Sequence, residues 1–167
     1  INRCKVSSLE AVIIRPFNVA GPRQSGKGGF VLPRFIEQAR NNQPLTVFGD
    51  GTQIRAFTHV ADIVDGLILA FQNGKSGEVY NLGNPTNKTT ILELAQQVIA
   101  IVGQGTIQFV DPQTLYGPLY AEAADKYPNA DKAQRELRWQ PTRDIQTTIR
   151  DGLLYSLGAS IALAEHL

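Results

Sequence analysis

The sequence has almost no cysteine and no excess of charge of either sign. Its 167 residues include a single cysteine, Cys4, which cannot form a disulfide within the chain, and no Cys/His cluster suggests a zinc site. The 16 basic and 15 acidic residues give a net charge of +1, and the basic residues are scattered along the chain. We therefore expect no nucleic-acid partner and a reducing compartment, the cytoplasm.

Long apolar runs are also lacking. No stretch approaches the roughly 20 apolar residues that span a bilayer, and the N-terminal INRCKVSSLE has no secretory apolar core, so no membrane partner is expected. Hydrophobic residues make up 43% of the chain, which is enough for one well-cored unit covering 1–167. The chain begins with Ile1 and reaches a strand-like run by Leu9, so it reads as a chain entered in the middle.

Several signatures of catalysis are missing. No G-x-G-x-x-G turn occurs, so the fingerprint of a nucleotide cofactor is absent. The serines and histidines do not form a triad at usable spacing, and the acidic residues form no metal cluster, so metal-based or nucleophilic chemistry is not expected. His59 precedes a predicted helix, and we interpret it as structural rather than catalytic.

Strand and helix patterns alternate along the chain, which predicts an α/β fold. The β-branched run 11–14 predicts a strand buried on both faces, as in a parallel sheet. Further strands are expected on either side of Gly49-Asp50-Gly51, over 78–82 and over 107–110, and the segment 111–128 is expected to be irregular.

Helices are predicted where apolar residues recur every three or four positions. The pattern favours helices over 31–39, after His59, after the capping box of Thr90 and Glu93, over 131–137 and from 142 onward. In the helix after His59, Gly74 is expected to provide a left-handed stop. The residues expected on its apolar face are Val64, Leu67, Ile68 and Phe71.

The segment FGDGTQIRAF (48–57) places an arginine among residues suited to a sheet. We expect Gly49-Asp50-Gly51 to form a turn and Arg55 to lie on the strand that follows. The planar fork of donors on an arginine suits a diphosphate. The alternative is a surface arginine paired with Asp50 or Asp62, worth only ~0–1 kcal/mol if exposed.

Four segments together resemble a known family. They are RPFNVAGPR (15–23), LTVFGDGTQIRAFTHVAD (45–62), YNLGNP (80–85) and ELRWQP (136–141). In this order and spacing they resemble the extended short-chain dehydrogenase/reductase family. Within that family they look most like the NAD-dependent nucleotide-sugar epimerases, dehydratases and decarboxylases, especially UDP-glucuronate decarboxylase-like members. The resemblance covers nearly the whole chain.

The family also has motifs that this sequence lacks. Its members carry a glycine-rich NAD-binding turn and a catalytic Tyr-x-x-x-Lys pair upstream of the Arg-x-x-Asn strand, and neither occurs here. The resemblance therefore implies the C-terminal half of such an enzyme: the last strand or strands of a Rossmann sheet plus a small mixed α/β lobe that binds a sugar nucleotide. NAD is expected in the full-length parent but not bound stably by this chain alone, which is expected to be inactive.

The resemblance assigns roles to individual residues. Arg55 matches the arginine that binds the substrate's diphosphate. Asn18 matches an asparagine that hydrogen-bonds the substrate near its diphosphate, although it could instead form an Asx turn. Thr46, through its backbone, and Phe48, through its ring, match the uracil pocket, although Phe48 could equally be core. The remaining matches are Val31 and Leu32, as main-chain contacts to the nucleotide or ordinary core, and Pro16 and Phe17, which approach the nicotinamide.

One part of the family pattern is not met. The segment containing Glu122 and Lys126 is where the family carries an arginine for the second side of the diphosphate and an acid for the ribose. Here no arginine occurs between Arg55 and Arg135, so Lys126 is the only basic residue of that segment. This departure weakens the match to a UDP-glucuronate decarboxylase in particular.

Two functions remain open from the sequence. The first is the substrate-binding part of an NAD-dependent sugar-nucleotide enzyme, with a UDP-sugar as the favoured ligand and a homodimer as the expected parent. The second is an autonomous, non-catalytic binding or scaffolding module that partners a separate Rossmann half. In the first case, unpaired strand edges should make the isolated chain self-associate.

Overall fold

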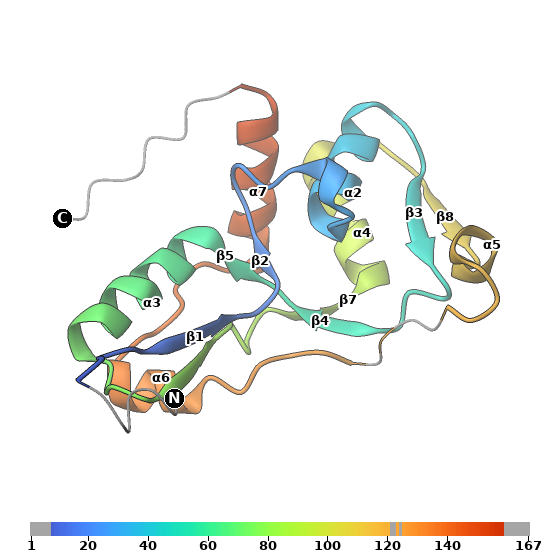
Figure 1. The fold of residues 1–167 in the computed structure, drawn as a ribbon. Helices are drawn as coiled ribbons and strands as arrows, with labels where there is room; N and C mark the ends of the chain where they lie inside the picture. Colours follow the sequence, from blue (N-terminus) through green and yellow to red (C-terminus); the bar gives the residue numbers. More distant parts are fainter. Residues whose placement is uncertain (1–7, 121–122, 124, 159–167) are drawn as a thin grey trace.

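The computed structural model describes residues 8–120, 123 and 125–158 and shows short strands alternating with helices (Figure 1). The strands are β1 (Ile13–Pro16), β2 (Val19–Ala20), β3 (Leu45–Phe48), β4 (Ile54–Ala56), β5 (Thr58–His59), β6 (Val79–Leu82), β7 (Lys88–Thr90) and β8 (Ile107–Val110). The helices are η1 (Gly26–Gly28), α2 (Val31–Arg40), α3 (Val60–Asn73), α4 (Ile91–Val102), α5 (Pro112–Tyr116), α6 (Asp131–Leu137) and α7 (Ile145–Ser156). The α/β fold expected from the sequence is confirmed.

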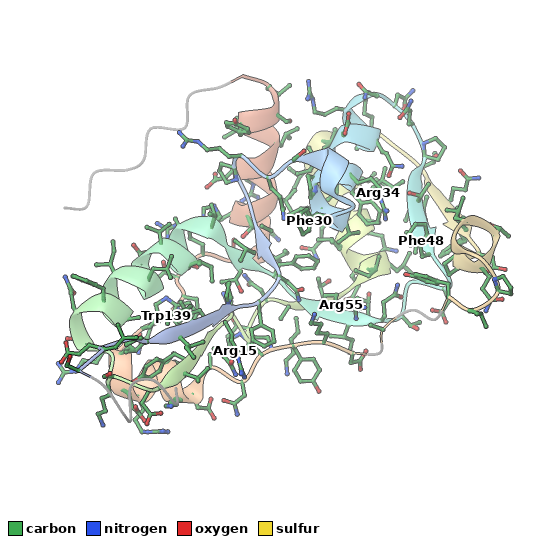
Figure 2. All side chains as sticks on the ribbon, in the orientation of Figure 1. Arg15, Phe30, Arg34, Phe48, Arg55 and Trp139 are labelled. Atoms are coloured by element: carbon green, nitrogen blue, oxygen red, sulfur yellow. The ribbon has the colours of Figure 1, made fainter. Side chains whose placement is uncertain are left out.

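One part of the molecule is built on the parallel pair β1 and β6. The strands run in register from Ile13 opposite Val79 to Pro16 opposite Leu82. Parallel neighbours need a crossover, and α3 provides it directly before β6. The buried ring of Trp139 packs with residues of α3, β6 and α6 in one hydrophobic cluster (Figure 2).

A second cluster lies among α2, α4, α7 and the parallel pair β3 and β8. The predicted face of α2 is confirmed, since Phe35, Ile36 and Ala39 are buried. The predicted capping box that opens α4 is present, with Thr90 and Glu93 bonding each other's backbone N–H. The backbone N–H of Thr90 lowers the pKa of the Glu93 carboxyl below its ordinary value.

The strands on either side of Gly49-Asp50-Gly51 do not pair with each other. The two glycines have φ values of 62° and 73°, so the expected turn is present. However, β3 pairs with β8, while β4 pairs antiparallel with β7, bringing Arg55 opposite Thr89. The turn therefore redirects the chain from one sheet to another.

Two expectations about α3 and its surroundings are wrong. Gly74 has a φ of −70°, so it does not end α3 in the left-handed region. A glycine is needed there for another reason, because a Cβ at this position would lie 2.4 Å from the Ala70 carbonyl oxygen. The stripe of Val64, Leu67, Ile68 and Phe71 is exposed, and the opposite face of α3 is buried.

The prediction that the first strand, β1, is buried on both faces is also wrong. It is parallel as expected, but among its four residues only Ile14 is partly buried. None of the helices in the described part of the chain is long and apolar enough to cross a membrane.

Candidate functional site

A cavity of about 280 Å³ lies where α2, β3 and β4 approach one another. The segments that line it are far apart in the sequence and include β2, α2, β3, β4 and the start of α4. Its described lining residues are Asn18, Val19, Ala20, Gln24, Gly29, Phe30, Val31, Leu32, Arg34, Phe48, Gln53, Arg55, Phe57, Ile91 and Tyr120. Five of the eight residues predicted to contact the substrate are in this set: Asn18, Val31, Leu32, Phe48 and Arg55.

Asn18 lies between β1 and β2 in a left-handed backbone conformation, with a φ of 39°. Its side-chain Nδ2 donates to the Ala56 carbonyl 3.0 Å away, and its own carbonyl accepts from the Thr58 amide. These two bonds connect Asn18 to the chain around β4 and β5. They hold the carboxamide at the cavity, and its second N–H and its oxygen are the groups a ligand would use.

Arg55 lies on β4, at the cavity and below α2 in Figure 2. Its Nη1 donates to the Ile54 carbonyl at 2.9 Å and its Nη2 to the Ala123 carbonyl at 2.8 Å. The Lys126 amide also donates to the Ile54 carbonyl, so this later segment runs alongside β4. Arg55 therefore binds the backbone of Ala123 in addition to lining the cavity.

The two acids considered as alternative partners of Arg55 have partners elsewhere. The Asp50 carboxylate accepts bonds from the backbone and hydroxyl of Thr52. Those bonds, the backbone one foremost, lower the pKa of Asp50. Asp62 instead forms an ion pair with Arg143.

Arg34 and Phe48 form a stacked pair at the wall of the cavity. The guanidinium carbon of Arg34 lies 4.7 Å from the centroid of the Phe48 ring, within the range of a cation–π contact, and Figure 2 shows the two side by side. The Arg34 Nη2 also donates to the Thr46 carbonyl at 3.2 Å. Phe48 is partly buried and lines the cavity, so it is not simply a core residue.

Thr46 is fixed by side chains of α2. Its backbone N–H donates to the Gln38 Oε1, its hydroxyl accepts from the Gln38 Nε2, and its carbonyl accepts from Arg34. The backbone predicted to contact a base is therefore bonded within the chain here. Thr46 does not line the cavity, but its carbonyl accepts a hydrogen bond from Arg34, which does.

The other predicted residues are distributed as follows. Leu32 is buried and belongs to the core as well as to the cavity wall, whereas Val31 is partly buried. Pro16 ends β1 and Phe17 follows it, and neither lines the cavity. Lys126 is exposed and is not among the lining residues, and Glu122 lies outside the described residues.

Sequence reasoning missed Arg34 as a residue of this site. A signal was present, since Val31, Arg34 and Gln38 recur at three- and four-residue spacing and so share one side of α2. Gln53, Phe57 and Tyr120 were also missed as lining residues.

His59 is a structural residue. It is only 4% exposed and caps the N-terminus of α3, where its Nδ1 accepts from the Ala61 amide. Its Nε2 lies 3.2 Å from an Asp151 carboxylate oxygen on α7. Burial lowers the pKa of His59, and Arg143 lowers it further, against the opposing effect of Asp151 and Asp62. Among the described residues, no group of His, Cys, Asp and Glu side chains lies together as metal ligands would.

The lowered pKa of His59 predicts that the chain loses stability in mild acid. Since the folded pKa lies below the unfolded value of about 6.5, unfolding takes up a proton once the pH falls below that value, and the loss is at most about 1.4 kcal/mol per pH unit. Urea unfolding between about pH 7.5 and pH 5.5 measures it. His59→Asn keeps an acceptor for the Ala61 amide but cannot titrate, so its stability should vary less with pH; an unchanged dependence would contradict the assignment.

Comparison with known proteins places this geometry in context. Residues 2–83 match the NAD dependent epimerase/dehydratase family. UDP-glucuronic acid decarboxylase 1 of Arabidopsis thaliana is 36% identical over 148 residues, which are 88% of this chain and 31% of that protein.

Two solved structures are similar to the chain throughout. The UDP-glucuronic acid 4-epimerase of Bacillus cereus, in complex with UDP-glucuronic acid and NAD, has a TM-score of 0.80 and 29% identity, covering 92% of this chain and 47% of the epimerase. The UDP-glucose 4-epimerase of Thermotoga maritima, with UDP-glucose, has a TM-score of 0.81 and 25% identity, covering 93% of this chain and 48% of that one. The chain thus spans about a third to a half of the length of these relatives.

Proposed function

The chain belongs to the NAD-dependent epimerase/dehydratase family, among the extended short-chain dehydrogenases/reductases, and we propose that it forms the part of such an enzyme that binds the nucleoside-diphosphate sugar. A UDP-sugar is the favoured ligand. One observation carries the proposal: Asn18 from the β1–β2 connection, Phe48 from β3 and Arg55 from β4 line the same cavity.

The chemistry of the cavity supports an anionic ligand with a flat ring. Two arginines, Arg34 and Arg55, line it, and none of its described lining residues is an Asp or Glu. The rings of Phe30, Phe48 and Phe57 supply apolar surface of the kind that packs against a base. The volume, about 280 Å³, lies near the lower end of the range for small-molecule sites.

Our proposal for this chain covers the sugar nucleotide and not NAD. Pro16 and Phe17, the two residues matched to the nicotinamide, lie at the carboxyl end of β1, outside the cavity. Pro16 is exposed, and the sequence contains no glycine-rich turn for the cofactor's phosphates. We therefore assign to this chain the binding of the sugar nucleotide and derive no step of hydride transfer from it.

The test is the binding of UDP to the chain. At a concentration about 100 times its dissociation constant, UDP should stabilise the fold by about 2.7 kcal/mol, which a thermal melt detects as a rise in Tm. Uridine should give a smaller rise because it cannot engage Arg55 through a diphosphate. The proposal for this chain fails if UDP, dTDP and GDP all leave both the Tm and the heat of titration unchanged.

A further inference from the structure

The backbone around Phe57 is bound by an asparagine on each of its two edges. Phe57 joins β4 to β5, and although it is buried it contributes to the wall of the cavity. On one edge, the Asn18 side chain donates to the Ala56 carbonyl, and the Asn18 carbonyl accepts from the Thr58 amide. Successive residues of a strand direct their backbone groups to alternate edges, so the amide and carbonyl of Phe57 face the other edge. The residue that they meet there is Asn87.

Asn87 directly precedes β7 and binds both backbone groups of Phe57. Its carbonyl accepts from the Phe57 amide at 3.3 Å, and its side-chain Nδ2 donates to the Phe57 carbonyl at 3.1 Å. The same Nδ2 donates to the Arg143 carbonyl at 3.0 Å, so both N–H groups of the carboxamide have an acceptor. Because both acceptors are carbonyl oxygens, a carboxylate of the same shape could not take the place of this amide.

Asn87 is connected to the cavity without lining it. It is 5% exposed, and it is not among the described residues of the cavity wall. A buried amide or carbonyl that loses its partner is costly, so the bonds of Asn87 fix where the Phe57 backbone lies. The position of that backbone in turn sets the place of the Ala56 carbonyl, to which the Asn18 side chain is bonded. A displacement at Asn87 would therefore move the Asn18 carboxamide.

We infer that Asn87 is a positioning residue of the sugar-nucleotide site, which holds the Asn18 carboxamide in the orientation that a ligand meets. The inference rests on the proposed function, because it takes the cavity to be the site of the nucleotide. Asn18 needs support from its surroundings, since its φ of 39° is a conformation that few residues other than glycine adopt. An amide that is already held in place loses less freedom when the ligand binds.

Asn84 offers a matched comparison within the same buried network. It is 2% exposed, and its Nδ2 donates to the Arg143 carbonyl at 3.2 Å, so it shares this acceptor with Asn87. Its Oδ1 accepts from the amide and hydroxyl of Thr86, and its link to Thr58 is made by its backbone amide, which an alanine keeps. If Asn87 only stabilised the fold, alanine variants of the two asparagines would have the same effect on ligand binding.

Calorimetric titration with UDP tests the inference. Asn87→Ala leaves the Phe57 carbonyl without its donor and should weaken UDP binding about tenfold, a coupling typical of one hydrogen-bond network. Asn84→Ala should also destabilise the chain in urea, but its affinity for UDP should stay within about twofold of the unmodified value. Asn18→Gly accepts the positive φ and removes only the side chain, so in that background Asn87→Ala should cost less than about threefold. The inference is overturned if the losses of the two variants multiply, or if Asn87→Ala folds and binds UDP with unchanged affinity.

Hydrogen exchange gives a second measurement that does not depend on the variant folding. In the unmodified chain, UDP should slow exchange at the Phe57 and Thr58 amides by a similar factor, and by more than in the middle of α4, whose amides report global unfolding. Slowing at Thr58 without slowing at Phe57 would overturn the inference while leaving the proposed function intact. If UDP does not bind the unmodified chain, the proposed function fails instead. Exchange at Thr58 without nucleotide then decides the role of Asn87, since it should be faster in Asn87→Ala than in Asn84→Ala, and equal rates would overturn the inference.

Discussion

Replacing Asp62 with alanine should lower the free energy of unfolding of the chain by about 3–5 kcal/mol, the cost typical of removing one partner from a buried ion pair. The side chain of Asp62 is 1% exposed and lies in the first turn of α3. Its Oδ1 pairs with the Arg143 guanidinium, its Oδ2 accepts from the Arg143 amide at 3.2 Å, and the Thr142 hydroxyl donates to Oδ1 at 3.3 Å. Without the carboxylate, these donors lose their acceptor.

The effect is large because Asp62 joins distant parts of the chain. Thr142 and Arg143 directly precede α7, eighty residues further along, and the backbone carbonyl of Asp62 accepts from the Trp139 ring N–H at 2.8 Å. The carboxylate thus ties the start of α3 to the segment that leads into the last described helix. Trp139 is the only tryptophan and is buried, so its fluorescence in a urea titration reports the unfolding.

Asp65 provides a matched control. Its carboxylate lies 3.5 Å from the same Arg143 guanidinium, but its side chain is 59% exposed. Asp65→Ala should therefore cost no more than ~1 kcal/mol, as for most exposed ion pairs. Equal losses in the two variants would mean that burial does not set the strength of this cluster.

The elements that could be predicted from the sequence are those that depend on neighbouring residues. The capping box of Thr90 and Glu93 lies within a single turn of the helix that it opens. The alternation of strands and helices likewise sufficed for the α/β fold. Each of these signals is local, so nothing elsewhere in the chain had to be known.

The buried side of α3 could not be read from periodicity, because both sides are apolar. What selects the buried side is the small size of Gly66, which lets the helix approach β6: a Cβ there would lie 2.5 Å from a Leu82 methyl and 3.0 Å from the Trp139 ring nitrogen. Strand pairing posed the same difficulty. The partner of β3 is β8, some sixty residues away, and the turn between β3 and β4 does not reveal it.

The site was predicted in part. Whether a residue lies within one of the motifs explains why Asn18 was predicted and Arg34 was missed. Asn18, Phe48 and Arg55 were found because they lie in segments that resemble the family. Arg34 lies on α2 between these segments, where a cation on a half-exposed helix is ordinary. Its importance appears only when β3 brings the Phe48 ring beneath it.

Replacing Arg55 with alanine should abolish the stabilisation of the chain by UDP. We expect a loss of about 2–5 kcal/mol in binding free energy, the range for removing one partner of a buried, charge-assisted contact. Arg55→Lys should bind UDP with an affinity between those of the unmodified chain and Arg55→Ala, because lysine keeps the charge but lacks the planar fork of donors. Calorimetric titration with UDP measures both variants against the unmodified chain.

This experiment needs a control for stability, because Arg55 also forms hydrogen bonds within the chain. Its bonds to the Ile54 and Ala123 carbonyls hold a neighbouring segment, so Arg55→Ala should unfold at a somewhat lower temperature even without ligand. Arg15→Ala removes the same charge from β1, outside the cavity, and should bind UDP as the unmodified chain does. If Arg55→Ala remains folded and binds UDP with unchanged affinity, then Arg55 serves only to bind the Ile54 and Ala123 carbonyls, and the diphosphate lies elsewhere.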